Sequence, residues 1–121
     1  MKIQKFFNAF TTYCNLLKLK CIGVQVGSKA RFCGDVSFCI NRISKVVFGK
    51  GLIITGGYNI NALSPSERSY ILVRKNTELI IGNNCGFSSI CISVHDSIRI
   101  GNNVIIGANT RLNDSNDHCI N

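Results

Sequence analysis

Apolar residues recur at every sixth position through the C-terminal half of the chain. They occupy Ile81, Phe87, Val94, Ile100, Ile106 and Leu112, with one extra residue, Ser93, between the second and the third. Small or apolar residues follow four positions after these, at Cys85, Cys91, Ile98, Val104 and Thr110. A period of six matches neither an α-helix nor a single β-strand. It predicts an all-β fold of hexapeptide repeats, a parallel β-helix in which three short strands complete a triangular turn of roughly eighteen residues.

Glycine and asparagine mark the corners of this predicted coil. The string Ile-Gly-Asn-Asn at 81–84 returns nineteen residues later at 100–103. Glycine directly after an anchor relieves crowding where the chain turns, because it has no Cβ. Asparagine adopts the left-handed backbone conformation more readily than most residues. The repeated string therefore predicts corners of the same kind in successive coils.

The sixfold spacing continues less regularly toward the N-terminus. Its earlier anchors are Val26, Phe32, Phe38, Phe48 and Ile54. The phase is lost over residues 39–47 and again over about 55–75. The second gap contains Gly56-Gly57 and the single proline, Pro65, which predicts a loop inserted at about 55–75. Such a loop is either functional or a tolerated surface insertion.

The first twenty residues follow a different pattern. Apolar side chains recur at steps of three and four, at Ile3, Phe6, Phe7, Phe10, Cys14 and Leu17. This predicts an amphipathic helix over residues 1–20, followed by the β-helix domain over 21–121. Polar residues interrupt the run, which excludes a signal peptide, and its length excludes a membrane span. Two interpretations remain: a cap on the open end of the coil, or a helix lying at an anionic membrane surface.

Charge is concentrated in the first part of the chain. The net charge is +8, and residues 1–50 hold nine Lys or Arg against Asp35 alone. Residues 51–121 carry five basic and five acidic side chains. An anionic neighbour is therefore expected for the first part only, such as phospholipid, an acidic glycan or the phosphates of CoA. No recognition motif for nucleic acid accompanies the charge, so nucleic acid is not expected as a partner.

Seven cysteines are present, without a C-x-x-C motif or a Cys/His cluster at zinc spacing. No metal site is expected. Cys33 and Cys39 lie one hexad apart, as do Cys85 and Cys91, which predicts small apolar core residues rather than disulfides. A reducing compartment, the cytoplasm, is consistent with this.

The chain has two histidines, His95 and His118, and a general base working near neutral pH is expected to be one of them. His118 follows the last anchor in the polar run Asp114-Ser115-Asn116-Asp117-His118. A histidine at the end of a repeat array belongs on an edge or loop. Taken alone, a histidine in such a place is more often a solvated surface residue than a catalytic base.

The segment 79–118, and more loosely 22–121, resembles the hexapeptide-repeat acyltransferases. The resemblance is carried by Ile-Gly-Asn-Asn-Val-Ile-Ile-Gly-Ala-Asn at 100–109 and by the Asp-x-x-x-His run at 114–118. It is to the sugar O-acetyltransferase branch, which includes galactoside and maltose acetyltransferases and the enzymes that modify bacterial capsule and exopolysaccharide. The resemblance implies a left-handed coil, a homotrimer with active sites between subunits, and acetyl-CoA as acyl donor. It also implies a saccharide acceptor in surface polysaccharide synthesis, in the cytoplasm or at the inner face of the membrane.

The same resemblance assigns roles to individual residues. His118 would take the proton from a sugar hydroxyl as the hydroxyl attacks the thioester carbonyl of acetyl-CoA. Ser88 stands where relatives place an acceptor-binding asparagine, and Asp96 stands near an acidic acceptor-binding position. Asp117 joins this set, although many relatives have Asp-Phe before the histidine where this chain has Asn116-Asp117. No residue is assigned to acetyl-CoA.

Relatives also continue through several further coils after this histidine, and those coils form the CoA groove. Three residues follow His118 here. We therefore expect either an incomplete form of a longer enzyme, which transfers acetyl groups poorly, or a non-catalytic β-helical scaffold derived from one.

Overall fold

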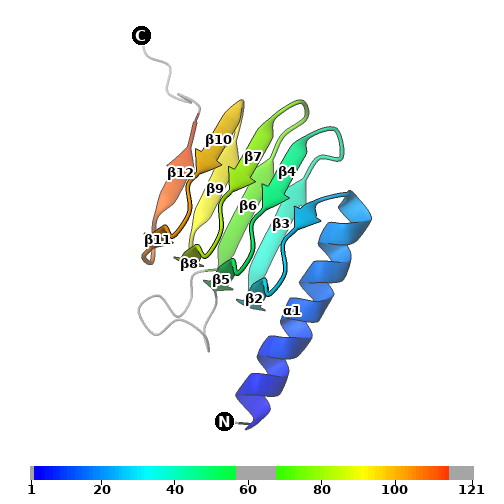
Figure 1. Cartoon of the computed structure of the whole chain (residues 1–121), viewed down its shortest axis with the longest axis vertical. Helices are drawn as coiled ribbons and strands as arrows, with labels where there is room; N and C mark the ends of the chain where they lie inside the picture. The colour runs from blue at the N-terminus through cyan, green and yellow to red at the C-terminus, as the bar shows by residue number, and fades with distance from the viewer. Residues whose placement is uncertain (1, 57–67, 115–121) are drawn as a thin grey trace.

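The computed structural model describes residues 2–56 and 68–114, which form one helix followed by twelve short strands (Figure 1). Helix α1 spans Lys2–Ile22. Sheet A contains β1 (Gln25–Val26), β4 (Lys45–Phe48), β7 (Glu78–Ile81) and β10 (Ser97–Ile100). Sheet B contains β2 (Arg31–Gly34), β5 (Ile53–Gly56), β8 (Gly86–Ser88) and β11 (Ile105–Ile106). Sheet C contains β3 (Val36–Ile40), β6 (Ser69–Val73), β9 (Cys91–Val94) and β12 (Arg111–Asn113).

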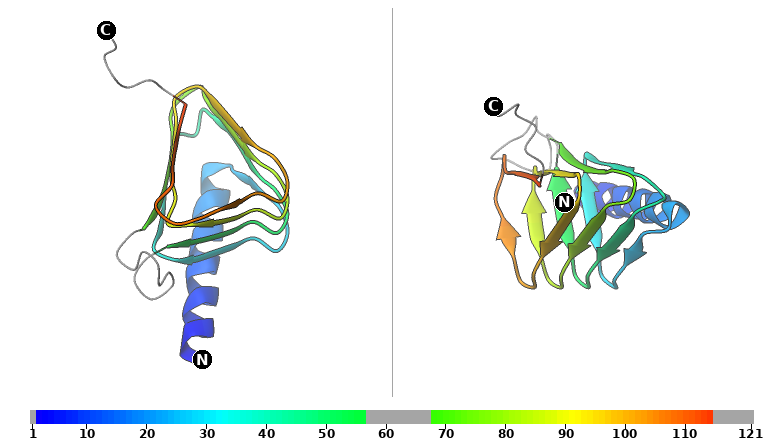
Figure 2. Two further views of the ribbon diagram at one scale, coloured as in Figure 1. Left: turned by 90° about the vertical axis from the view of Figure 1, so that its left-hand side faces the viewer. Right: turned by 90° about the horizontal axis from the view of Figure 1, so that it is seen from above.

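Each strand from β1 to β9 pairs in parallel with the strand three places further along the chain, so the described residues form four stacked coils. The predicted parallel β-helix is confirmed. Seen along its axis from the C-terminal coil, the chain passes clockwise from β10 through β11 to β12 as it comes toward the viewer (Figure 2, left). The coil is therefore left-handed, against the usual preference of parallel crossovers.

Anchor residues fill the interior of the prism, as their spacing predicts. In the first two coils the core is aromatic, with Phe32, Phe38 and Phe48 each coming from a different sheet. The rings of Phe32 and Phe38 meet edge to face with centroids 5.3 Å apart, and Phe48 lies 6.1 Å and 6.2 Å from them. Aliphatic residues continue the core in the third coil, where Leu79, Ile92 and Val94 are inaccessible to solvent. Stacked anchors thus bury each coil against its neighbours.

One detail of the predicted register is wrong. Leu112 pairs with Ile92 and not with Val94, so the corner before β9 is one residue shorter than the corner before β12, and the extra length of the third coil lies between Ile92 and Ile100. Ile92 therefore points inward in the place expected for Val94, and the fully buried Ile90 takes the place expected for Cys91, which is half-buried. The period alone cannot choose between Ile92 and Val94 as the anchor, because both are apolar and both point inward from β9.

Parts of the two phase gaps are regular strands. β3 and β4 enter the first gap, and the second begins with β5 and ends with β6, which pairs with β3 and β9. The expected loop at 55–75 is therefore wrong for residues 69–73. Residues 57–67 lie outside the described part of the chain, and a loop there stays a prediction.

The corners have the conformations expected from their asparagines. Asn84, Asn103 and Asn109 have φ values of 58°, 60° and 63°. The neighbouring asparagines link the coils: the Asn83 backbone N–H donates to Oδ1 of Asn102 at 2.7 Å, and the N–H of Lys50 donates to Oδ1 of Asn83 at 2.8 Å. Each repeat string therefore supplies both a turn and a hydrogen bond to the coil before it.

Helix α1 covers the N-terminal end of the prism, and the cap interpretation is confirmed for its C-terminal half. Leu19 is fully buried and Leu16 packs against the core. Thr12 and Thr11 contact the backbone of β2, the edge strand of sheet B. The N-terminal half extends past the prism (Figures 1 and 2). No helix among the described residues is long and apolar enough to cross a membrane.

The cysteine prediction holds only in part. Cys33 and Cys85 are buried, as expected for core residues, but Cys39 is exposed and Cys91 is half-buried. Cys39 and Cys91 lie on outward positions of sheet C because strand residues alternate between the two faces. Cys14 and Cys21 of α1 are also exposed, and the described cysteines are all free thiols.

Candidate functional site

The corner between sheets C and A in the third coil is held by a carboxylate from the fourth coil. Asp114, directly after β12, accepts hydrogen bonds from the backbone N–H groups of His95 at 2.6 Å, Asp96 at 2.8 Å and Ser97 at 2.6 Å. Three successive N–H groups directed at one carboxylate form a strong, charge-assisted arrangement. The Asp114 carboxylate therefore joins the end of the fourth coil to the corner that follows β9 in the third coil.

The electrostatics of this corner favour the ionised carboxylate. Burial of the Asp114 side chain, which is 15% exposed, raises its pKa, but the backbone N–H groups of His95, Asp96 and Ser97 lower it by more. The net result is a pKa below the ordinary value for aspartate. The Nδ1 atom of His95 lies 3.7 Å from Oδ1 of Asp114. A protonated His95 would therefore form an ion pair there.

Asp96 and Ser88, two of the residues expected to bind the acceptor, lie at different corners of the third coil. Asp96 is exposed between β9 and β10, at the corner held by Asp114. Ser88 ends β8, before the corner between sheets B and C, and its Oγ accepts a hydrogen bond from the Thr55 hydroxyl at 3.2 Å. The structure does not bring these two side chains together. His118 and Asp117 lie outside the described residues, so their predicted roles stay predictions.

The corner between sheets B and C carries a shallow depression of about 240 Å³ that the sequence pattern did not indicate. Its lining comes from the second, third and fourth coils: Arg68, Ser89, Cys91, Asn109, Thr110 and Arg111. Arg68 also forms an exposed ion pair with Asp35, at 3.2 Å. Two arginines give the depression a positive character. The two arginines are far apart in the sequence and line the same depression because Arg68 directly precedes β6 and Arg111 begins β12, two strands of the same sheet.

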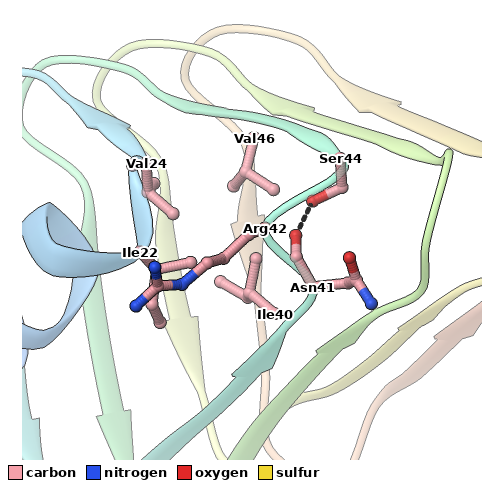
Figure 3. Close-up of a pocket in the computed structure, with 8 residues that line it drawn as sticks. Ile22, Val24, Ile40, Asn41, Arg42, Ser44 and Val46 are labelled. Atoms are coloured by element: carbon pink, nitrogen blue, oxygen red, sulfur yellow. Dashed lines mark hydrogen bonds between the residues drawn. The ribbon is translucent and has the colours of Figure 1, made fainter.

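A second cavity lies where α1 ends against the first coil. Figure 3 shows Arg42 reaching toward Ile22, beside Val24 and Val46, and Ser44 donating a hydrogen bond to the Asn41 carbonyl. Its volume is about 10 Å³. This is about the size of one water molecule, which excludes a site for a cofactor or sugar.

Within residues 2–56 and 68–114, no three side chains of His, Cys, Asp or Glu are grouped closely enough to hold a metal ion. Among the described residues, His95 has its Nδ1 atom close to the carboxylate of Asp114. Comparison of the chain with protein-family models, with curated proteins and with solved structures found no match.

Proposed function

We propose that this protein is an O-acetyltransferase that moves the acetyl group of acetyl-CoA to a hydroxyl of a saccharide in surface polysaccharide synthesis. The observation that carries the proposal is a left-handed hexapeptide coil whose fourth turn leads, through Asp114, into the run that ends at His118. The resemblance to sugar O-acetyltransferases rests on the same residues. The proposal includes a homotrimer in the cytoplasm or at the inner face of its membrane.

The chemistry assigned to His118 is general base catalysis. A neutral imidazole accepts the hydroxyl proton as the sugar oxygen attacks the thioester carbonyl, and the thiolate of CoA leaves. A backbone N–H would stabilise the oxyanion formed on the way. Asp114 supports this arrangement indirectly. Its three hydrogen bonds hold the start of the run to His118 against the third coil.

A non-catalytic β-helical scaffold is the alternative, and one observation favours it. Ser88 and Asp96, the two described acceptor-binding candidates, lie at separate corners, and the Ser88 hydroxyl already accepts a hydrogen bond from Thr55. One small sugar cannot contact both positions within one subunit. In an enzyme, the two side chains would have to serve different sites or different subunits.

Mass spectrometry of saccharide acceptors incubated with protein and acetyl-CoA tests the proposal. Detection of free thiol is unsuitable because Cys14, Cys21 and Cys39 are exposed. His118→Ala should lower transfer by about 10²–10⁴-fold if His118 is the base. His95→Asn, which changes the other histidine, is the matched control and should retain transfer.

Binding of CoA is measured separately by calorimetry. CoA binding with transfer that is lost in His118→Ala supports the enzyme. Transfer at full rate in His118→Ala contradicts the role of His118, and absence of both binding and transfer favours the scaffold.

A further inference from the structure

Helix α1 presents an aromatic stripe to solvent. Phe6, Phe10, Tyr13 and Leu17 follow one another at helical spacing and are 74%, 57%, 63% and 47% exposed. Phe7 lies beside them and is also exposed. The stripe therefore consists of large side chains that the prism does not cover, although their spacing is that of a buried helix face.

The side of α1 that packs on the prism is mainly polar. Thr12 hydrogen-bonds the backbone of β2, Thr11 accepts the N–H of Gly34 at 3.3 Å, and the Asn15 amide donates to the Thr11 carbonyl at 3.0 Å. Leu16 and Leu19 are the main apolar contacts on this side. The helix thus turns its more apolar face away from the core. A contiguous exposed apolar face of this kind marks an interaction surface.

Positive charge flanks the stripe. Lys18 and Lys20 are exposed on the last turns of α1, close to Leu17. Residues 1–34 contain six Lys or Arg and no Asp or Glu. Lys29 and Arg31, in the first coil against which α1 packs, are exposed as well. The partner of this surface must therefore combine an apolar layer with negative charge.

We propose that α1 lies on an anionic phospholipid membrane, with the aromatic stripe inserted at the boundary of headgroups and acyl chains. An aromatic face bordered by lysines on a helix that cannot span the bilayer is the pattern of interfacial helices. Because the N-terminal half of α1 projects past the prism, the stripe can reach a flat surface (Figure 2, left). A second copy fits less well, since pairing two such helices would bring lysines of like charge together. The proposal does not depend on acetyl transfer.

Flotation of the full chain with vesicles tests the aromatic contribution. Wild-type protein should float with phosphatidylcholine vesicles that contain phosphatidylglycerol and stay in solution with phosphatidylcholine alone. Phe6→Ser and Phe10→Ser should each weaken binding on the order of tenfold, because each removes an inserted aromatic ring. Ile105→Ser is the matched control: Ile105 is 85% exposed on β11, in the coil farthest from α1, and its loss should leave binding unchanged.

Charge reversal tests the electrostatic contribution. Lys18→Glu with Lys20→Glu should weaken binding by at least about fivefold for each lysine. Lys50→Glu with Lys75→Glu makes the same change in net charge at exposed positions outside α1 and should have a clearly smaller effect. Circular dichroism verifies that each variant is folded.

Three results would overturn the proposal: no binding to anionic vesicles, equal binding to neutral ones, or binding that the α1 variants leave unchanged. If Phe6→Ser and Phe10→Ser dissociate an oligomer in light scattering without affecting flotation, the stripe belongs to contacts between copies instead.

Discussion

The hydroxyl of Thr12 makes two hydrogen bonds with the backbone of Phe32. It accepts the Phe32 N–H at 3.1 Å and donates to the Phe32 carbonyl at 3.2 Å. Phe32 belongs to β2, the first strand of its sheet, so these groups have no strand partner on that side. A threonine of α1 therefore does what a neighbouring strand would do. It removes an open edge that could otherwise pair with another chain.

Thr12→Val should destabilise the protein by about 1–3 kcal/mol, because an isosteric methyl leaves both backbone groups of Phe32 unsatisfied. Urea unfolding followed by circular dichroism measures the change. Thr12→Ser keeps the hydroxyl and should recover most of the stability. A Val variant as stable as the wild type would show that solvent satisfies this edge equally well.

Asp114→Asn should destabilise the fold by about 1–3 kcal/mol at neutral pH, because an amide cannot accept three backbone hydrogen bonds as a carboxylate does. Asp35→Asn is the control. Asp35 pairs with Arg68 on an exposed surface, where such a pair contributes about 0–1 kcal/mol.

The Asp114 contribution also depends on pH. Its pKa is lowered on folding, so its stabilisation is fully present above the unfolded pKa of about 3.9 and is lost as pH falls through the lower folded value. Urea titrations of wild type and Asp114→Asn at pH 7 and at acid pH should therefore converge toward acid. A difference between the two proteins that stays constant with pH would contradict this assignment.

Gly82→Ala should be strongly destabilising, and Gly101→Ala should be nearly neutral. A Cβ on Gly82 would lie 2.4 Å from Oδ1 of Asn102 and 2.7 Å from the backbone of Gly101, whereas a Cβ on Gly101 would have nothing within 4 Å. Overpacking of this kind typically costs ~1–3 kcal/mol. Thermal unfolding of the two variants compares them directly. Equal losses would mean that Gly101 is also covered in solution.

Ser69→Ala should destabilise the fold by about 1–3 kcal/mol. Ser69 is fully buried at the start of β6, where its Oγ donates to the Thr55 carbonyl at 2.7 Å and accepts the N–H of Ile90 at 3.1 Å. Ser69, which follows closely after residues 57–67, thus joins the chain to both the second and the third coil. Ser28→Ala, at an exposed corner, is the control and should change urea unfolding by less than about 0.5 kcal/mol. Unaltered stability of the Ser69 variant would show that these bonds are replaceable.

The coil, its corners and the helix before it can be predicted from the pattern of residues along the chain. A hexapeptide repeat stacks on its nearest neighbours, so the spacing of Ile81, Ile100 and Ile106 is enough to predict that these three side chains point inward. Asn84 and Asn103 mark corners because the left-handed conformation is a local property of the residue and its turn.

Features that depend on contacts between residues far apart in the sequence could not be predicted in this way. The period could not show that Ile92, and not Val94, stacks on Leu112, since both residues are apolar and both point inward from β9. Helical spacing identified the apolar face of α1 but not the face that packs on the prism. The packing face was determined by the unpaired edge of β2, because a threonine hydroxyl can hydrogen-bond the backbone groups of that edge and a phenylalanine ring cannot. The bonds from Asp114 to His95 and Ser97 likewise arise from the stacking of successive coils, which no local pattern encodes.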